Sequence, residues 1–446
     1  MLTIVGGGGF RVPLVHQALL AARDRVDVSD VVLLDTDPRR LAVMTDVLAQ
    51  AGPSGGPRVR ATTEPEEALT GADVVFAAVR VGGTAGRTRD ERDAMAEGLL
   101  GQETVGPGGL AYALRTVPVV DALAEQIAEH APAAWTITFT NPASIVTEAM
   151  RDRLGDRVVG ICDTPIALVR NALRALGLDP RGFDTGEVAV DYAGLNHLGW
   201  LRGLHCDGTD LLPGLLADDA ALAGIEEARL MGADWLRALR AIPNEYVYYY
   251  DFAREAVAAL AAAPHTRGEY LAEQQETFYA AASARPGEAH ALWRAALAER
   301  EATYMATERE SADAGQRGAE DLGGGYHEVA VDLMAALLGG EEHRMILDVA
   351  NDAGGGTPVV PGLPTDAVVE VPVLASAAGV RPLPTRTGLD PVMTARLQAV
   401  KAAERLTIEA ARTESVTTAW RALAAHPLVD SVAVARRLAE RALGGR

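Results

Sequence analysis

Two residues that could bind a metal lie where apolar segments are interrupted. Cys162 ends the buried-strand pattern of RVVGICDTP, and His197 belongs to the polar Asn-His pair within YAGLNHLGW. A thiol and an imidazole that meet in a cleft can hold a divalent metal and leave open positions for substrate oxygens and water. Two ligands are too few for a structural zinc site, so the spacing alone also fits a buried thiol and a core histidine.

A glycine-rich turn follows the first predicted strand and precedes a predicted helix. It consists of Gly6, Gly7, Gly8, Gly9 and Phe10. Glycines at this place let backbone amides approach a diphosphate, although Arg11 or Val12 stands where the third glycine of G-x-G-x-x-G would be. Asp35 ends the second predicted strand, where a carboxylate can bond ribose hydroxyls and would repel a 2′-phosphate. The turn and Asp35 predict NAD binding; the alternative is a glycine-rich turn without a nucleotide.

Four polar side chains follow other predicted elements. Arg80 and Arg87 lie in AAVRVGGTAGRTRDE, Asn141 in TFTNPAS and Arg267 in PHTRGEY. A guanidinium is the best bidentate partner for a phosphate or carboxylate, and an amide can bond substrate hydroxyls. Exposed arginines are also commonly solvated or paired with acids, and asparagine before proline favours a simple turn. The residues alone leave both interpretations open.

A tyrosine cluster lies in AIPNEYVYYYDF, at the predicted start of a helix. Its members are Tyr246, Tyr248, Tyr249 and Tyr250. A phenol can act as a base when cations or a metal lower its pKa. Aromatic clusters more commonly pack in cores, so the cluster by itself does not indicate catalysis.

The elements that must position these residues alternate along the first 165 residues. LTIV, VVLLD, ADVVFAAV, AWTITFTN and RVVGIC are continuous in apolar residues, as buried strands are, with helical patterns such as PLVHQALLAARD between them. This alternation predicts an α/β fold with a doubly wound, Rossmann-like parallel sheet. Active-site residues are then expected just beyond the carboxyl ends of the strands.

The second part of the chain has a different pattern. Residues 212–335 are predicted to be mostly helical, VVEVPVLASAAGVRPLP predicts a small sheet, residues 354–364 form a loop by composition, and long helices resume from Asp390. We predict an NAD-binding domain over residues 1–165. A mostly helical α+β domain for substrate, metal and oligomerisation is predicted over 166–446, the arrangement of lactate and malate dehydrogenases.

Charge and composition exclude several classes of partner. The net charge of −20 argues against nucleic acid or an anionic membrane, so an anionic substrate would need a local arginine cluster. The two cysteines, Cys162 and Cys206, suit a reducing compartment. No apolar run approaches the ~18 residues of a membrane span, and Met1 leads directly into a strand without a leader pattern. The expectation is a soluble, cytoplasmic protein.

Many segments match, in order, those of one known family. They include the glycine turn, RVGG, GQETVGPGG, ALRTVPVV, TNPAS, GICDTP, GLNHLGW, NEYVYYY, HTRGE, VVEVPV and ERLTIEAA. The chain therefore resembles glycoside hydrolase family 4, and specifically its 6-phospho-β-glucosidase branch. The resemblance implies NAD- and Mn²⁺-dependent hydrolysis of 6-phospho-β-glucosides to glucose 6-phosphate and an aglycone, by oxidation at C3, elimination, water addition and re-reduction.

The resemblance also implies a role for each candidate residue. Cys162 and His197 would hold the metal, Tyr246 would remove the C2 proton, and Asp163 would protonate the leaving group. The residues implied to contact the phosphorylated sugar are Arg87, Asn141 and Arg267. A homodimer or homotetramer, acting on a phosphorylated disaccharide or glucoside, is implied as well.

The chain departs from the family pattern in two places. GGGGFRVP replaces the serine or threonine that many relatives have after three glycines. The position of Asp163 is often asparagine in β-specific members and is aspartate in some α-specific ones. A 6-phospho-α-glucosidase therefore stays open as the first alternative. An NAD-dependent 2-hydroxy-acid dehydrogenase is less well matched, because its histidine motif has no counterpart here. A catalytically inactive sensor would not need Cys162, His197 and Tyr246 together.

Overall fold

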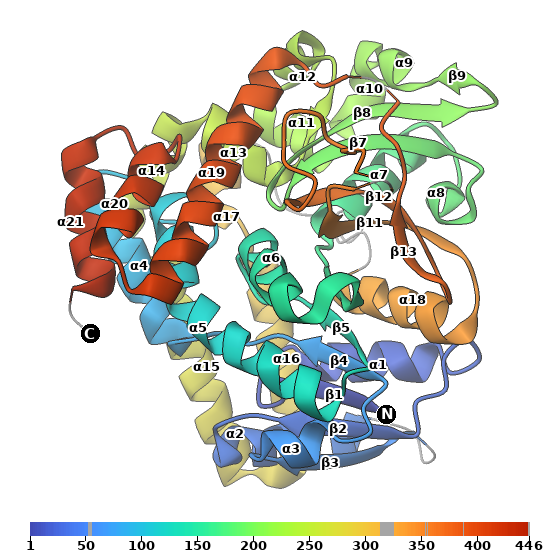
Figure 1. Cartoon of the computed structure of the whole chain (residues 1–446), viewed down its shortest axis with the longest axis vertical. Helices are drawn as coiled ribbons and strands as arrows, with labels where there is room; N and C mark the ends of the chain where they lie inside the picture. The colour runs from blue at the N-terminus through green and yellow to red at the C-terminus, as the bar shows by residue number, and fades with distance from the viewer. Residues whose placement is uncertain (52–55, 313–324, 353, 355, 387, 445–446) are drawn as a thin grey trace.

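The computed structural model describes all residues except 52–55, 313–324, 353, 355, 387 and 445–446 (Figure 1). The described residues form one sheet of 13 strands with helices around it. The parallel strands are β1 (Leu2–Val5), β2 (Asp30–Leu34), β3 (Arg58–Thr62), β4 (Val74–Ala77), β5 (Trp135–Thr138) and β6 (Val158–Gly160). The remaining strands are β7 (Ala189–Leu195), β8 (Leu198–Cys206), β9 (Thr209–Asp210), β10 (Ile242–Pro243), β11 (His343–Ala350), β12 (Val368–Ser376) and β13 (Gly379–Pro382).

The helices of the first part are α1 (Val12–Ala21), α2 (Pro38–Ala51), α3 (Pro65–Leu69), α4 (Gly83–Ala96), α5 (Gly106–His130), α6 (Ala143–Leu154), α7 (Thr164–Ala175) and α8 (Gly182–Thr185). Short 3₁₀ turns lie at Gly155–Arg157, Glu245–Val247 and Pro286–Glu288. The middle helices are α9 (Leu212–Ala217), α10 (Asp219–Ala223), α11 (Glu226–Met231), α12 (Ala233–Leu239), α13 (Tyr248–Asp251), α14 (Ala253–Ala262), α15 (Arg267–Ala284), α16 (Ala289–Ala302), α17 (Ala306–Ser311) and α18 (Tyr326–Gly339). The last helices are α19 (Pro391–Thr413), α20 (Val416–Ala425) and α21 (Val432–Leu443).

The parallel strands lie in the order β3-β2-β1-β4-β5-β6, which is the doubly wound order of dinucleotide-binding folds. Alternate residues of each strand enter two separate cores. Ile4, Leu33 and Phe76 pack in the core that includes α1 and α2. Val5 and Val32 pack in the opposite core, which includes α3, α5 and α6. Helices therefore cover both faces, and the predicted fold class is confirmed.

Strand β3 was not among the predicted strands. Its sequence, RVRAT, places Arg58 and Arg60 in a strand at the edge of the sheet, where it pairs only with β2 among the described residues. An edge strand does not need apolar residues on both faces, so the continuous apolar pattern that marks the other strands is absent. The composition of β3 therefore does not predict a strand.

The predicted small sheet of the second half is instead part of the main sheet. Strand β11 pairs antiparallel with β6, and the order continues through β12, β7, β8 and β10. At the junction Asp348 lies opposite Gly160, where a Cβ atom would come within 2.8 Å of the Asp348 Cβ. The absent side chain at Gly160 therefore lets the two halves join. The division at residue 165 stays a prediction, although the parallel strands do end close to it.

The other expectations for the second part are confirmed where residues are described. The region 212–335 contains mainly helices, and residue 354 and residues 356–364 have no helix or strand, whereas residue 355 lies outside the described part. Helix α19 begins directly after Asp390, whose side chain accepts from the Val392 amide. None of the helices in the described ranges combines the length and apolar character needed to cross a membrane.

A buried lysine joins α19 to α6. The Lys401 ammonium donates to Ser144 Oγ at 3.0 Å and to Glu148 Oε2 at 2.9 Å, and it pairs with Glu404 at 2.5 Å. Burial alone would lower the pKa of Lys401, but the two carboxylates outweigh burial and raise it. The charge is therefore kept and is compensated locally.

Replacing Lys401 with methionine is expected to lower the free energy of unfolding by about 3–5 kcal/mol, because two buried carboxylates lose their shared cation. Urea denaturation at neutral pH measures the change. Glu409→Gln, an exposed change on the same helix, serves as the control and is expected to stay within about 0.5 kcal/mol. A loss below about 1 kcal/mol for Lys401→Met would contradict this interpretation.

Candidate active site

A cavity of about 1570 Å³ lies beyond the carboxyl ends of the parallel strands. One wall comes from the segments after β1, β2, β4, β5 and β6, and the opposite wall from the segments around α15, α16 and α17. The predicted site residues that line it are Gly6, Gly9, Phe10, Asp35, Arg87, Asn141, Cys162, Asp163, His197, Tyr246 and Arg267. Ligands of doubly wound sheets bind in this crevice, so the fold brings the candidates to the expected place.

Two of the predicted glycines support the turn from behind and do not line the cavity. A Cβ atom on Gly7 would lie 2.7 Å from Leu33 Cα, and one on Gly8 would lie 2.7 Å from Arg40 Cβ. Gly7 thus lets the turn pack closely against β2, and Gly8 lets it pack against the first turn of α2. Their predicted contact with a cofactor stays a prediction.

Asp35 is held in place at the end of β2 by backbone amides. Its Oδ2 accepts from the Gly8 amide at 3.0 Å, and its Oδ1 accepts from the Asp37 amide at 3.0 Å. A carboxylate has about four acceptor positions, so lone pairs remain for hydroxyl donors. Asp35 is therefore pre-oriented at the cavity wall.

The two candidate metal ligands come from opposite sides of the β6–β11 junction. Cys162 follows β6, and its Sγ lies 3.4 Å from Thr164 Oγ1. His197 lies in the two-residue turn between β7 and β8 with φ 64°, the left-handed region. The preceding Asn196 donates to Glu370 Oε1 at 3.2 Å, which fastens this turn to β12. The turn therefore fixes the imidazole at the cavity.

Both candidate metal ligands are buried, and burial shifts the pKa of each. Burial, followed by the charges of Glu370 and Asp163, raises the pKa of the Cys162 thiol well above its usual value. Burial lowers the pKa of His197 to about 3, so the imidazole is neutral and available as a ligand. Its Nδ1 lies 3.1 Å from Thr104 Oγ1. Within the described ranges no group of three or more His, Cys, Asp or Glu side chains could hold a metal.

Tyr246 stacks on His197, with ring centroids 3.7 Å apart and an interplanar angle of 12°. Its hydroxyl lies 2.9 Å from the Tyr304 hydroxyl, which donates to Glu245 Oε1 at 2.9 Å. Burial and then the Glu245 charge raise the pKa of Tyr246 well above its usual value. The phenol can act as a base only when positive charge lies next to it.

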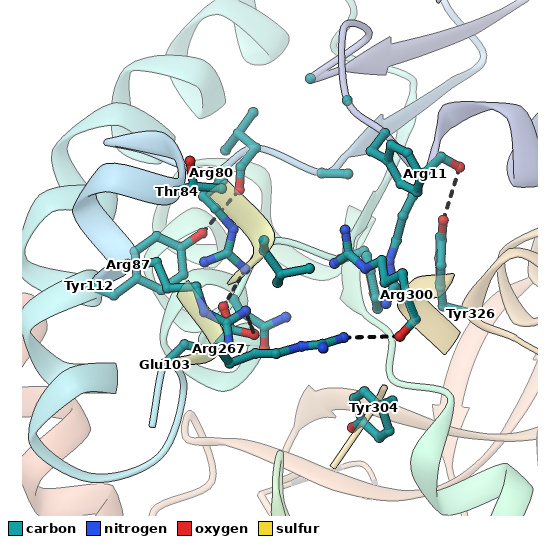
Figure 2. A pocket seen from close by; sticks show the side chains of 18 of the residues that line it. Arg11, Arg80, Thr84, Arg87, Glu103, Tyr112, Arg267, Arg300, Tyr304 and Tyr326 are labelled. Atoms are coloured by element: carbon teal, nitrogen blue, oxygen red, sulfur yellow. Dashed lines mark hydrogen bonds and ion pairs between the residues drawn. The ribbon is translucent and has the colours of Figure 1, made fainter. Parts of the chain in front are cut away.

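Arginines surround one half-buried carboxylate, that of Glu103, on the other side of the cavity (Figure 2). Arg80 pairs with Glu103 at 2.6 Å and Arg87 pairs with it at 2.8 Å. Burial alone would raise the pKa of Glu103, but Arg80 and Arg87 outweigh it and lower the pKa to about 2. Arg267 donates to backbone and side-chain oxygens of Thr303, so it has no carboxylate partner among the described residues. The cluster keeps an excess of positive charge.

Asn141 and Asp163 complete the set of predicted residues. The Oδ1 atom of Asn141 is buried and has no hydrogen-bond partner in the described part of the chain. Asp163 precedes α7 and its side chain makes no capping hydrogen bond there. An unsatisfied buried amide oxygen costs free energy, so it points to a donor supplied by a bound molecule.

Several cavity residues were missed from the sequence. Glu103 lies in GQETVGPGG, one of the segments that carry the family resemblance, but the resemblance implies no role for this glutamate. Arg300 and Tyr304 come from a helical region without any motif, so nothing in the sequence indicated them. The sequence distinguishes Arg11 only as a residue that stands in place of a glycine.

The fold and cavity define an enzyme built on a Rossmann-type half, and comparison with known proteins gives its family. The model described as "Family 4 glycosyl hydrolase" matches residues 1–178, and the one described as "Family 4 glycosyl hydrolase C-terminal domain" matches residues 192–429. The chain therefore belongs to family 4 of the glycosyl hydrolases. The resemblance inferred from its motifs is confirmed.

Relatives of both anomeric specificities are similar to the chain. A 6-phospho-alpha-glucosidase of Leptotrichia buccalis is 29% identical, over 98% of this chain and 95% of its own. A probable 6-phospho-beta-glucosidase of Bacillus subtilis is 29% identical, over 99% of this chain and 95% of its own. The 6-phospho-beta glucosidase of Thermotoga maritima, solved with NAD and glucose-6-phosphate, has a TM-score of 0.81 at 25% identity and covers 99% of this chain and 97% of its own.

Glu103→Gln is expected to lower the free energy of unfolding by about 2–3 kcal/mol at neutral pH, because Arg80 and Arg87 lose their shared carboxylate. The pKa of Glu103 is lower in the folded state than the ~4.3 of an unfolded glutamate, so its stabilisation is complete above that value. The difference between variant and wild type should shrink as the pH falls from about 4 toward 2.

Urea denaturation at several pH values measures this difference. Glu129→Gln, on the exposed side of α5, is the control for removing a carboxylate. A variant that is as stable as wild type at neutral pH would rule out the stabilising role of Glu103.

Proposed function

We propose that the chain hydrolyses 6-phospho-β-glucosides to glucose 6-phosphate and an aglycone, with NAD⁺ and a divalent metal such as Mn²⁺. The observation that carries the proposal is the meeting, in one cavity, of a glycine turn, a thiol with an imidazole, a tyrosine and an arginine cluster. A simple glycosidase needs two carboxylates, and a simple dehydrogenase needs no thiol, so the combination fits the redox route of this family.

The residues at the turn fit a dinucleotide. A Cβ atom on Gly9 would lie 2.8 Å from the carbonyl oxygen of Gly6, so the turn is too tight for larger side chains. The amides of Phe10 and Arg11 donate to no group in the described ranges, which leaves them for phosphate oxygens. Asp35 stands where the ribose hydroxyls would bind. The likeness to the T. maritima enzyme, solved with NAD, supports the same cofactor.

The residues after β6 and between β7 and β8 fit a metal site open to substrate. A neutral imidazole and a thiol that becomes a thiolate on binding are two protein ligands, and substrate oxygens and water can complete the coordination. Imidazole and thiolate also suit zinc, and Mn²⁺ prefers oxygen ligands. The oxygens of the sugar would make the site suitable for Mn²⁺.

When bound, NAD⁺ supplies a hydride acceptor for the sugar C3 and the metal supplies a Lewis acid that also favours an ionised phenol at Tyr246. Tyr246 then removes the C2 proton, which a ketone at C3 makes acidic. Asp163 protonates the oxygen of the leaving aglycone. Asn141 accepts from a sugar hydroxyl through its unpaired Oδ1 atom.

Positive charge in the cavity fits a phosphorylated substrate. Arg87 is buried against Glu91 and Glu103, while Arg267 lacks a carboxylate partner among the residues described. Burial and then the charge of Arg87 lower the pKa of Arg267, which is the effect of crowded cations. A sugar 6-phosphate would compensate this charge, despite the net charge of −20 on the whole chain.

The α anomer is the second candidate, and Asp163 favours it. The chain is also similar to a 6-phospho-alpha-glucosidase to the same extent as to a probable β-specific enzyme. Because the chemistry begins at C3, the same side chains can serve either anomer. We further propose a homodimer or homotetramer in the cytoplasm; Val392 and Val432, exposed at the starts of α19 and α21, suit an interface.

Release of p-nitrophenol from the α- and β-glucoside 6-phosphates tests the proposal. Turnover of the β anomer is expected with NAD⁺, Mn²⁺ and a thiol reductant, together with complete loss on addition of a chelator. The unphosphorylated glucosides should not react, because the arginine cluster then keeps its excess charge. Turnover of the α anomer alone would show that the enzyme is specific for α-glucosides and would contradict the proposed β specificity. Accumulation of NADH on hydroxy acids without any glucoside cleavage would refute the hydrolase function.

Tyr246→Phe is expected to lower kcat by about 10²–10⁴-fold, since the base for the C2 proton is removed. NAD⁺ binding should stay within about twofold of wild type, because the ring still stacks on His197. Exchange of the C2 hydrogen with solvent deuterium, followed by NMR, should be lost as well. Tyr250→Phe, in the same cluster, is the control. Unchanged exchange in the Tyr246 variant would assign the base elsewhere.

A further inference from the structure

Two arginines project into the middle of the cavity without a carboxylate partner. Figure 2 shows Arg11 and Arg300 facing each other, apart from the group formed by Arg80, Arg87 and Glu103. In the described part of the chain, neither guanidinium has a carboxylate within 4.0 Å, and the side-chain partner of Arg11 is the neutral phenol of Tyr326, whereas the cluster around Glu103 is paired. Their positive charge is therefore available to a ligand.

The uncompensated charge also affects Arg300 itself. Burial, followed by the charges of Arg11, Arg87 and Arg267, lowers the pKa of Arg300 well below its usual value, and Glu103 offsets only part of this effect. Partly desolvated guanidinium groups that repel each other cost free energy in the absence of an anion. A bound anion would remove this cost.

The position of the pair links it to the glycine turn. Arg11 is the residue directly before α1, and the Arg300 guanidinium carbon lies 5.6 Å from the Phe10 ring centroid. Arg11 is also pre-oriented, because its carbonyl accepts from the Tyr326 hydroxyl at 3.0 Å and its guanidinium carbon lies 5.1 Å from the Tyr326 ring centroid. The two cations thus stand beside the amides of Phe10 and Arg11 that lack partners.

We propose that Arg11 and Arg300 together bind the diphosphate bridge of a dinucleotide held on the glycine turn. This inference rests on the proposed function, in which the cavity takes NAD⁺. Two guanidiniums match the two negative charges of the bridge, and they lie at the turn itself. The sugar 6-phosphate has its own cations in Arg87 and Arg267.

Binding of NAD⁺ and of glucose 6-phosphate, each measured by calorimetry, tests the pair. Arg11→Met and Arg300→Met are each expected to weaken NAD⁺ binding by about tenfold and to leave glucose 6-phosphate binding within about twofold of wild type. Arg11→Lys and Arg300→Lys should retain part of the affinity, because they keep the charge but lose the bidentate geometry. Arg294→Met, an exposed change on α16, is the matched control and should not change either affinity.

Unchanged NAD⁺ affinity in both methionine variants would overturn the inference. A loss confined to glucose 6-phosphate, or an equal loss for both ligands, would overturn it too, since the pair would then serve the sugar phosphate or the cavity as a whole. A wild-type protein that binds no NAD⁺ would refute the proposed function together with the inference. Circular dichroism and Tm establish that each variant is folded. If a methionine variant is not folded, the NAD⁺ and glucose 6-phosphate affinities of the corresponding lysine variant are compared with those of wild type instead.

Discussion

The site depends on the close contact between β6 and β11 at Gly160. Because this position has no side chain, the antiparallel strands continue the parallel sheet without a break. Cys162 leaves the sheet two residues after Gly160, and the His197 turn is carried by strands of the same sheet. Both candidate metal ligands therefore belong to one hydrogen-bonded framework, although they come from the two parts of the chain.

The second determinant is the distribution of charge inside an acidic molecule. The net charge is −20, yet the cavity concentrates arginines from distant segments. The Glu103 carboxylate compensates the charges of Arg80 and Arg87, so these arginines can lie close together even when no anionic ligand is bound. The remaining cations are the groups that a phosphorylated ligand would contact. Positive charge is thus gathered in one part of the cavity, although the molecule as a whole is acidic.

Much of the fold could be predicted from the sequence, because buried parallel strands have continuous apolar runs. The edge strand β3, with Arg58 and Arg60, lacks such a run and was missed. The small sheet predicted for the second half is continuous with the main sheet, because pairing across Gly160 is a tertiary event that no local pattern encodes. Cavity-lining residues within distinctive segments, such as Cys162 and His197, could be predicted from the sequence. Arg300 could not, since a helical arginine has the same local pattern whether it faces solvent or a cavity.

The buried ammonium between α6 and α19 has a practical consequence, because Lys401 is the single lysine among the 41 basic Lys and Arg residues. An acylating reagent has no exposed lysine side chain to modify while α19 stays packed on α6. Modification of Lys401 would therefore report the opening of this contact, and its rate would measure how frequently the C-terminal helices detach from the sheet. The protein thus carries a built-in chemical probe of its own local unfolding.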